Sequence, residues 1–302
     1  MDKLEWLKER QCGIGGSDVG AILGVNRYKT PFEVYIEKTE PIEEIKDQFE
    51  SAYWGDQLEE IVAKEFEKRT SKKVRRDRKH YKHKDYPFMV ANIDRRVVGE
   101  NAILECKTAN QYLTNEWQED EVPASYLLQV QHYLFVTGAE VGYIAVLIGG
   151  QKFIWKEIQR DEELIQMIIE SEKNFWKLVQ DKTPPALDGS SAAEKYLKEK
   201  YKEAETDKSI ELGFEYKEKI KSYLDMKVQL KNFETQVKEL ENQIKFQLGN
   251  AEYGYAPGYS LSWKNVSSNR VDTKKLKSDY PEVYEKVVKE ILSRKFNIKE
   301  DK

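Results

Sequence analysis

Residues 89–108 read MVANIDRRVVGENAILECKT, and they are the most informative segment of the chain. The apolar residues on either side of positions 99–101 predict two short strands joined by a turn. Asp94 lies near the end of the first strand, and Glu105 and Lys107 lie in the second. Because side chains alternate across a strand, Glu105 and Lys107 point to one face. We therefore expect two carboxylates and one amine to converge at the edge of a sheet.

This constellation suits metal-dependent hydrolysis of a phosphodiester. Carboxylates are hard oxygen ligands for Mg²⁺ or Mn²⁺, and an ammonium beside them can orient water or stabilise a phosphoryl oxygen. The alternative is a solvated hairpin with alternating charges, since 34% of the residues are charged. The apolar residues of both strands favour a central place in the sheet, where ionisable groups need a partner or a metal.

Five blocks of sequence surround and include this hairpin. They are WLKERQCGIGGSDVGAILGVNRYKTP at 6–31, YWGDQLEEIVAKEF at 53–66, the hairpin at 94–107, VPASYLLQVQHYLFVTGAEVGYIAVLIGGQKF at 122–153 and RDEELIQMIIESEKNFWKLV at 160–179. In this order they resemble the YqaJ-type viral recombinases, relatives of phage lambda exonuclease in the PD-(D/E)XK nuclease superfamily. The chain departs from that pattern because no proline precedes Asp94 and because Arg95 follows it. The proline is not chemically needed, so Asp94 remains the expected ligand.

The resemblance implies an α/β fold, with a restriction-endonuclease-like core, a mixed central sheet flanked by helices, and a mostly helical C-terminal appendage. It implies a Mg²⁺-dependent 5′-to-3′ exonuclease, with Mn²⁺ as a substitute, that digests linear double-stranded DNA from its ends. The remaining 3′ overhang would be paired by a single-strand annealing protein in phage-type recombination. A homo-oligomeric ring, a trimer or tetramer, is also expected.

The resemblance further implies the roles of the hairpin residues. Asp94, Glu105 and the backbone carbonyl of Cys106 would hold the metal ion, and Lys107 would position the attacking water. A lysine desolvated beside a metal could have a lowered pKa and accept the proton of that water. The metal alone could also activate the water, and the sequence leaves both possibilities open.

Two predicted helices add candidates to this site. Glu59 borders an apolar stripe formed by Leu58, Ile61, Val62 and Phe66, which by itself suggests an ordinary flanking residue; the resemblance makes Glu59 a metal-site glutamate. Gln131 lies in the apolar stripe of a helix over 124–136, and the resemblance implies that it faces the catalytic centre. We interpret Gln129 as structural and His132 as a packed or surface residue.

The segment from Gly13 to Asp18 is a glycine-rich turn that enters a helix, with Ser17 or Asp18 as the N-cap. Exposed amides at such a helix start can bind phosphate, although a plain turn and cap explains the glycines equally well. The resemblance implies that Arg10 and Ser17 hold the 5′-terminal phosphate of the DNA. Arginine suits this role because its planar fork can bind two phosphate oxygens.

Residues 68–84 read KRTSKKVRRDRKHYKHK and form a basic tract. It is either a solvated edge or a surface for DNA backbone phosphates, and its position before the hairpin favours DNA. His80 and His83 could suggest zinc, but no cysteine or third histidine is nearby. The formal net charge is −4, so any contact with DNA must be local.

Composition and the positions of proline and glycine residues predict the domain organisation of the 302 residues. Residues 1–186 form the nuclease domain, 187–209 a polar linker and 210–302 an appendage that contains one long helix. Seven apolar residues of that helix alternate three and four apart, either as a coiled-coil seam or as a face that packs within the chain. A strand pair around Pro257-Gly258 follows, then a helix that is capped by Asp272 and runs toward Glu290, and the role of the appendage is unknown.

The two cysteines are too few for a disulfide framework or a four-cysteine iron–sulfur cluster. No signal peptide or apolar run of ~18 residues is found, so we expect no membrane association and the cytoplasm of a bacterial host. Two alternative functions stay open: an endonuclease of restriction or structure-specific type with the same centre, and a non-catalytic DNA-binding or assembly protein.

Overall fold

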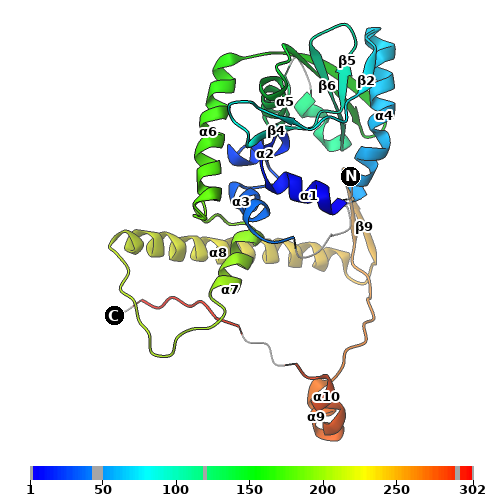
Figure 1. Ribbon diagram of the computed structural model, residues 1–302. Helices are drawn as coiled ribbons and strands as arrows, with labels where there is room; N and C mark the ends of the chain where they lie inside the picture. The colour runs from blue at the N-terminus through cyan, green and yellow to red at the C-terminus, as the bar shows by residue number, and fades with distance from the viewer. Residues whose placement is uncertain (1–2, 43–49, 118–120, 290–292, 301–302) are drawn as a thin grey trace. The chain divides into compact units, whose positions relative to one another are not determined.

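The computed structural model describes residues 3–42, 50–117, 121–289 and 293–300 (Figure 1). The chain forms two compact units, Met1–Lys200 and Tyr201–Lys302. The first unit is a mixed α/β structure, as expected. Its last helix, α7 (Ser191–Lys200), packs against α3 (Pro31–Thr39) and lies within the segment that the sequence suggested as a linker.

The main sheet of the first unit has five strands in the order β2-β5-β6-β7-β8. Their bounds are Val74–Arg76 for β2, Arg95–Val97 for β5, Ala102–Ala109 for β6, Val141–Ile148 for β7 and Lys152–Gln159 for β8. The central strands β6 and β7 pair in parallel, and the other neighbours are antiparallel. The sheet is therefore mixed. β7 is a nearly continuous apolar run and β6 begins with one, as expected of central strands whose two faces are covered by helices.

The predicted hairpin is present, with its turn at Gly99, but its first strand is divided. Residues 89–91 form β4 (Met89–Ala91), which pairs in parallel with β1 (Ile14–Gly15) and antiparallel with β3 (Tyr81–Lys82) in a separate three-stranded sheet. The chain enters the main sheet only at β5. Asp94 consequently lies at the junction between the two sheets rather than inside one continuous strand.

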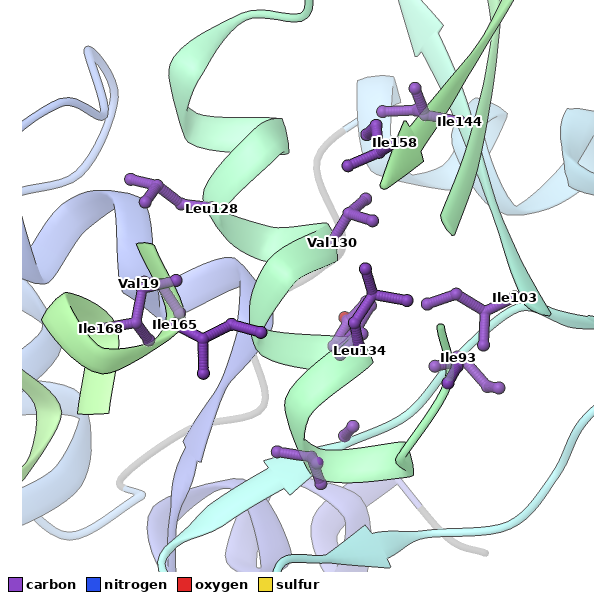
Figure 2. Close-up of a cluster of buried hydrophobic side chains, with 14 of the residues drawn as sticks. Val19, Ile93, Ile103, Leu128, Val130, Leu134, Ile144, Ile158, Ile165 and Ile168 are labelled. Atoms are coloured by element: carbon purple, nitrogen blue, oxygen red, sulfur yellow. The ribbon is translucent and has the colours of Figure 1, made fainter. Parts of the chain in front are cut away.

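Helices cover the two faces of the main sheet. On one face, Leu104, Tyr143 and Ala145 pack with Val62 and Phe66 of α4 (Glu50–Thr70). The other face carries a larger core, part of which is drawn in Figure 2, built with α2 (Gly16–Ile22), α5 (Ala124–Thr137) and α6 (Glu162–Gln180).

The larger core fixes the direction of the candidate site residues. Ile103 and Ile144 of the sheet pack with Val130 and Leu134 of α5 (Figure 2). Since side chains alternate along β6, residues 105 and 107 face α5 as Ile103 does. Residue 106 faces α4.

The remaining elements of the first unit are α1 (Lys3–Gln11) and the 3₁₀ helix η1 (Gln111–Trp117). The start of α2 differs from the prediction because its N-cap is Gly15, not Ser17 or Asp18. Asp18 lies three residues further on, where its carboxylate accepts a hydrogen bond from the Gly15 N–H at 3.3 Å. Helix α6 ends at Gln180, before the Thr183-Pro184-Pro185 segment, as the prolines predict.

The second unit contains α8 (Glu215–Leu248), the hairpin of β9 (Tyr253–Ala256) and β10 (Tyr259–Ser262), and two short helices, α9 (Thr273–Asp279) and α10 (Pro281–Val287). Asp272 caps α9 as predicted, but the helix then stops at Tyr280 because Pro281 restricts the residue before it. None of the helices in the described ranges combines the length and the apolar character that a membrane crossing requires.

Candidate active site

Asp94, Glu105 and Lys107 lie together at the junction of β5 and β6. The Asp94 Oδ2 atom accepts a hydrogen bond from the backbone N–H of Cys106 at 2.8 Å, so its carboxylate lies against β6. The Lys107 Nζ atom lies 2.7 Å from Glu105 Oε1. The Glu105 side chain is 6% exposed and that of Lys107 is 23% exposed, so only the lysine has appreciable contact with solvent.

The electrostatics of this cluster are those of two carboxylates sharing one ammonium. Burial and the neighbouring Glu105 raise the pKa of Asp94 to about 8. Burial lowers the pKa of Lys107, but Glu105 and Asp94 outweigh burial and the net shift is upward. Among these protein groups alone Lys107 is therefore an ammonium, whereas the lowered pKa expected from the sequence refers to a lysine beside a bound metal and stays a prediction.

Two features of the cluster fit a divalent cation. Glu105 Oε2 is buried and has no hydrogen-bond partner, and ionisation of Asp94 is opposed by Glu105, a repulsion that a cation would relieve. Within the described ranges, no three side chains of His, Cys, Asp or Glu are grouped to hold a metal ion. A cation here would thus depend on two carboxylates supplemented by backbone or water oxygens. Burial raises the pKa of the Cys106 thiol well above its usual range, which disfavours the sulfur as a ligand.

Glu59 is close to the cluster but is engaged elsewhere. Its Oε1 atom accepts hydrogen bonds from Arg95 and, at 3.2 Å, from Arg76. The buried Arg95 also donates to the backbone carbonyl of Asp94 at 2.9 Å and to Glu60 at 2.9 Å. Arg95 therefore ties α4 to the junction that carries Asp94. This role was not predicted from the sequence, although an arginine directly after the key aspartate was a signal.

Gln131 does not face the cluster, contrary to the expectation from the sequence. Its Nε2 atom donates to the Gln159 carbonyl at 2.7 Å, and its Oε1 atom accepts from the Asp161 N–H at 3.0 Å. Gln129 takes the expected position instead, because its Nε2 atom donates to Glu105 Oε1 at 2.7 Å. The apolar stripe could not distinguish the two residues, since α5 is buried on nearly all sides.

His132 is a buried structural residue. Its Nε2 atom lies 2.9 Å from the Val90 carbonyl, which can only accept, so this nitrogen carries a proton. Its Nδ1 atom lies 2.7 Å from Glu172 Oε1, and both side chains are fully buried. Burial lowers the pKa of His132, but Glu172 outweighs burial and raises it. The pair fastens α5 to α6 and to β4.

Arg10 and Ser17 line a separate pocket of about 160 Å³. The Arg10 Nη2 atom donates to Ser17 Oγ at 3.2 Å, and the buried ammonium of Lys38 lies on the same wall. Behind them Asp18 is fully buried, with Lys38 Nζ at 2.8 Å and Lys29 Nζ at 3.0 Å. Burial alone would raise the pKa of Asp18, but these lysines and Arg10 bring it below its usual range.

The pocket and the acidic cluster are connected through Tyr133. Its ring lines the pocket, and its hydroxyl accepts a hydrogen bond from Gln129 Nε2 at 3.1 Å. Burial and the carboxylates of Glu105 and Asp94 raise the pKa of Tyr133 well above its usual range, so the hydroxyl keeps its proton. A Cβ on Gly16 would lie 2.6 Å from this ring, which explains the glycine there.

The basic tract passes from the main sheet to the three-stranded sheet, in which residues 81–82 form β3. β2 is the edge strand, and its Arg75 and Arg76 are exposed. His80 Nδ1 is paired with Asn92 Oδ1 at 2.9 Å, whereas His83 stacks on Phe135 with ring centroids 4.1 Å apart. The two histidines have different partners, so their spacing in sequence does not make a zinc site.

Comparisons with known proteins give one family and one fold. A model of the YqaJ-like viral recombinase domain matches residues 5–140. The uncharacterized protein YqaJ of Bacillus subtilis is 54% identical over 303 residues, which cover 99% of this chain and 95% of that protein.

Among solved structures, the chain is similar to the alkaline exonuclease LHK-Exo of Laribacter hongkongensis, with 17% identity and a TM-score of 0.50. The similarity to the complex of that enzyme with dAMP has 18% identity and a TM-score of 0.51. Each match covers 66% of this chain and 97% of the other. At this level of identity the similarity concerns the fold.

Proposed function

This chain belongs to the YqaJ-like viral recombinase family, and from that membership and the geometry above we propose that it is a metal-dependent DNA exonuclease of the PD-(D/E)XK type. Its substrate is linear double-stranded DNA, which it digests 5′ to 3′ and leaves with a 3′ overhang. The observation that carries the proposal is the buried group of Asp94, Glu105 and Lys107, beside a pocket lined by Arg10 and Ser17.

Asp94 and Glu105 would hold Mg²⁺ or Mn²⁺, with the Cys106 carbonyl as a further oxygen. When bound, the cation supplies Lewis-acid activation of the scissile phosphate and of the attacking water. Glu105 is suited to this role because Lys107 and Gln129 both occupy its Oε1 atom and leave Oε2 without a partner. Glu59 remains a supporting residue as long as Arg95 and Arg76 hold its carboxylate.

Lys107 acts as an ammonium in this scheme. The neighbouring carboxylates raise its pKa, which favours a charged group that orients the attacking water and stabilises charge on a phosphoryl oxygen. Gln129 fixes the rotamer of Glu105, and Tyr133 fixes Gln129. Gln131 has no part in the chemistry.

The pocket with Arg10 and Ser17 would receive the 5′-terminal phosphate. Two cationic side chains, Arg10 and Lys38, lie on its wall, and the Ser17 hydroxyl adds a donor. A doubly charged phosphate monoester suits such a site better than an internal diester does, because it presents more charge and more acceptor oxygens. Capture of the terminal group would select DNA ends and set the 5′-to-3′ direction.

The proposed setting is phage-type recombination in the cytoplasm of a bacterial host. The 3′ overhang would pass to a single-strand annealing protein. A homo-oligomeric ring of three or four chains around the duplex would keep the enzyme on its substrate. The exposed arginines of β2 would contact the DNA backbone.

The test compares three substrates in the presence of Mg²⁺: linear duplex with a 5′ phosphate, the same duplex without it, and a closed circle. We expect fastest release of nucleotides from the phosphorylated linear duplex and none from the circle. Asp94→Asn, which keeps the shape of the side chain and removes its charge, serves as the inactive control.

Two other results would contradict the proposal, and each would favour a different function. Cleavage of the closed circle would indicate an endonuclease with the same centre. Tight DNA binding without release of nucleotides from any substrate would indicate a non-catalytic DNA-binding or assembly protein.

A further inference from the structure

Helix α8 presents a continuous apolar seam to solvent. The helix spans 34 residues, and none of them is buried. Its apolar residues alternate three and four positions apart, and each is between 40% and 63% exposed: Tyr223, Met226, Leu230, Phe233, Val237, Leu240 and Ile244. This spacing has a mean period of 3.5 residues, the repeat of a face that supercoils against another helix.

Among the described residues of the second unit, contacts are found at the two ends of this seam. Phe296 contacts the ring of Tyr223 at one end, with centroids 6.1 Å apart. At the other end Leu248 approaches Gly254 of the hairpin. Residues 226–244 between these contacts stay exposed. Because an amphipathic helix in water gains most of its stability from packing its apolar face, α8 requires a partner along this stretch.

The residues that flank the seam match a second copy of the same helix. With Tyr223 and Leu230 at heptad position a, the g positions are Gln229, Gln236 and Gln243, and the e positions are Lys227, Glu234 and Glu241. In two parallel helices in register, each g residue lies beside the e residue five positions further along the partner. Glutamine therefore meets glutamate in two successive pairs. An amide can donate to a carboxylate, and no two like charges face each other.

The seam residues also favour two strands in parallel. Val237 and Ile244 are β-branched residues at position a, and Leu240 lies at position d between them, a combination typical of parallel dimers. The lysines Lys231, Lys238 and Lys245 lie at position b, away from the contact. Every group that borders the seam is thus compatible with a copy of itself.

We propose that α8 joins two copies of this chain as a parallel, in-register, two-stranded coiled coil. The interface is formed by the seam from Tyr223 to Ile244 and is bordered by the glutamine–glutamate pairs. Each dimer therefore carries two copies of the first unit, and a ring of four chains would contain two such dimers. Because the interface is formed by α8 alone, it can be tested independently of the proposed nuclease activity.

The direct test is disulfide trapping in the full chain. Val237→Cys, in a Cys12→Ser background, places a thiol at the centre of the seam, where the two copies of residue 237 face each other. Mild oxidation should convert most of the protein into a dimer on a denaturing gel without reductant. Thr235→Cys lies on the outer face and should remain monomeric on the same gel.

A mixture of Phe233→Cys and Val237→Cys chains tests the orientation. If residue 237 links to residue 233 of the other chain but not to its own copy, the helices are antiparallel and the proposal is wrong. Absence of any link through residue 237 also overturns it, and indicates that another segment or another protein covers the seam.

Light scattering provides a second measurement. The variant Leu230→Glu/Val237→Glu places charges in the seam and should lower the molar mass of the full chain by a factor of two. The matched variant Lys231→Glu/Lys238→Glu changes two residues of the same helix outside the seam and should keep the mass of the wild type. Equal masses for the two variants would contradict the proposal.

Discussion

Gln129 and Lys107 approach the same oxygen of Glu105, each at 2.7 Å. Two donors on Oε1 fix the carboxylate in one orientation and leave Oε2 buried without a hydrogen bond. A buried carboxylate oxygen without a partner is costly unless something else binds it. In the proposed enzyme that partner is the metal ion, so Gln129 is a positioning residue for the metal ligand.

Gln129→Leu should therefore lower the rate of nucleotide release ~10- to 100-fold, a loss typical of residues that orient a metal ligand. The melting temperature should change little, because the lost hydrogen bonds are made to side chains only. Rates at saturating DNA, together with calorimetry of Mg²⁺ binding, measure the effect. A weaker affinity for Mg²⁺ is expected alongside the lower rate.

Gln131→Leu is the matched control, two residues away on the same helix. It leaves the Asp161 N–H and the Gln159 carbonyl without partners, so it should destabilise the fold by roughly 2–4 kcal/mol. Its activity per folded molecule should equal that of the wild type. The assignment fails if the Gln131 variant loses activity and the Gln129 variant keeps it.

Arg10→Gln should abolish the preference for a 5′ phosphate. Loss of a charged hydrogen bond to the terminal phosphate weakens binding by about 1.5–3 kcal/mol, which corresponds to roughly a 10- to 100-fold lower rate at limiting DNA. The rate on the duplex with a 5′ hydroxyl should be unchanged. The measured quantity is the ratio of the two rates.

Arg27→Gln is the control for this substitution. Arg27 is half exposed and pairs with Glu116 outside the pocket, so both rates should remain those of the wild type. Equal losses on both DNA ends in the Arg10 variant would show that Arg10 contributes general attraction to DNA rather than recognition of the terminal phosphate.

The alternation of apolar residues was sufficient to predict the hairpin that brings Asp94, Glu105 and Lys107 together. Alternation is a local property of each strand. The turn is also local, because it needs a residue that tolerates a positive φ, and Gly99 adopts a φ of 85° there. These features depend on neighbours in sequence, so the sequence reveals them.

The division of the first strand could not be predicted in the same way. β4 leaves the main sheet because it pairs with β1, a segment some 75 residues earlier in the chain. Likewise, the choice between Gln129 and Gln131 depends on which elements surround α5, and the residues of that helix are buried on nearly every side. Tertiary packing determines both the pairing of β4 and the orientation of the two glutamines. The pattern of apolar residues contains no information about that packing.

Asp18→Asn should destabilise the first unit and reduce its dependence on acid pH. Asp18 is fully buried, and the three nearby cations lower its pKa below the value it has in the unfolded chain. The unfolded state therefore binds more protons, so the stability that Asp18 contributes is complete above about pH 4. That contribution is lost as the pH falls further, through the folded pKa.

At pH 7 the substitution leaves Lys38 buried without its counter-ion, and the expected cost is roughly 3–5 kcal/mol. Urea unfolding at several pH values between 3 and 7 measures this effect. The gap between wild type and variant should narrow toward pH 3. Asp181→Asn changes an exposed acid and should follow the wild type throughout; a constant gap for Asp18→Asn would contradict the linkage.

Lys107→Met separates the two roles that an ammonium can have beside two carboxylates. The ammonium neutralises Glu105 and Asp94, and it therefore competes with a cation for the negative charge of these two carboxylates. Without it, Mg²⁺ should bind at least as tightly as in the wild type. Turnover should nevertheless fall by roughly 10²- to 10⁴-fold, because the charge that orients water and stabilises the phosphoryl oxygen is gone.

Asp94→Asn provides the contrast, since it should lose both Mg²⁺ binding and turnover. Calorimetric titration with Mg²⁺ and rates of nucleotide release, measured on the same preparations, separate the two effects. Lys107→Arg retains the charge but not the compact shape of the ammonium, and it should recover only part of the rate. If Lys107→Met binds Mg²⁺ normally and also turns over normally, the ammonium serves only to neutralise the acids, and activation of the water falls to the metal alone.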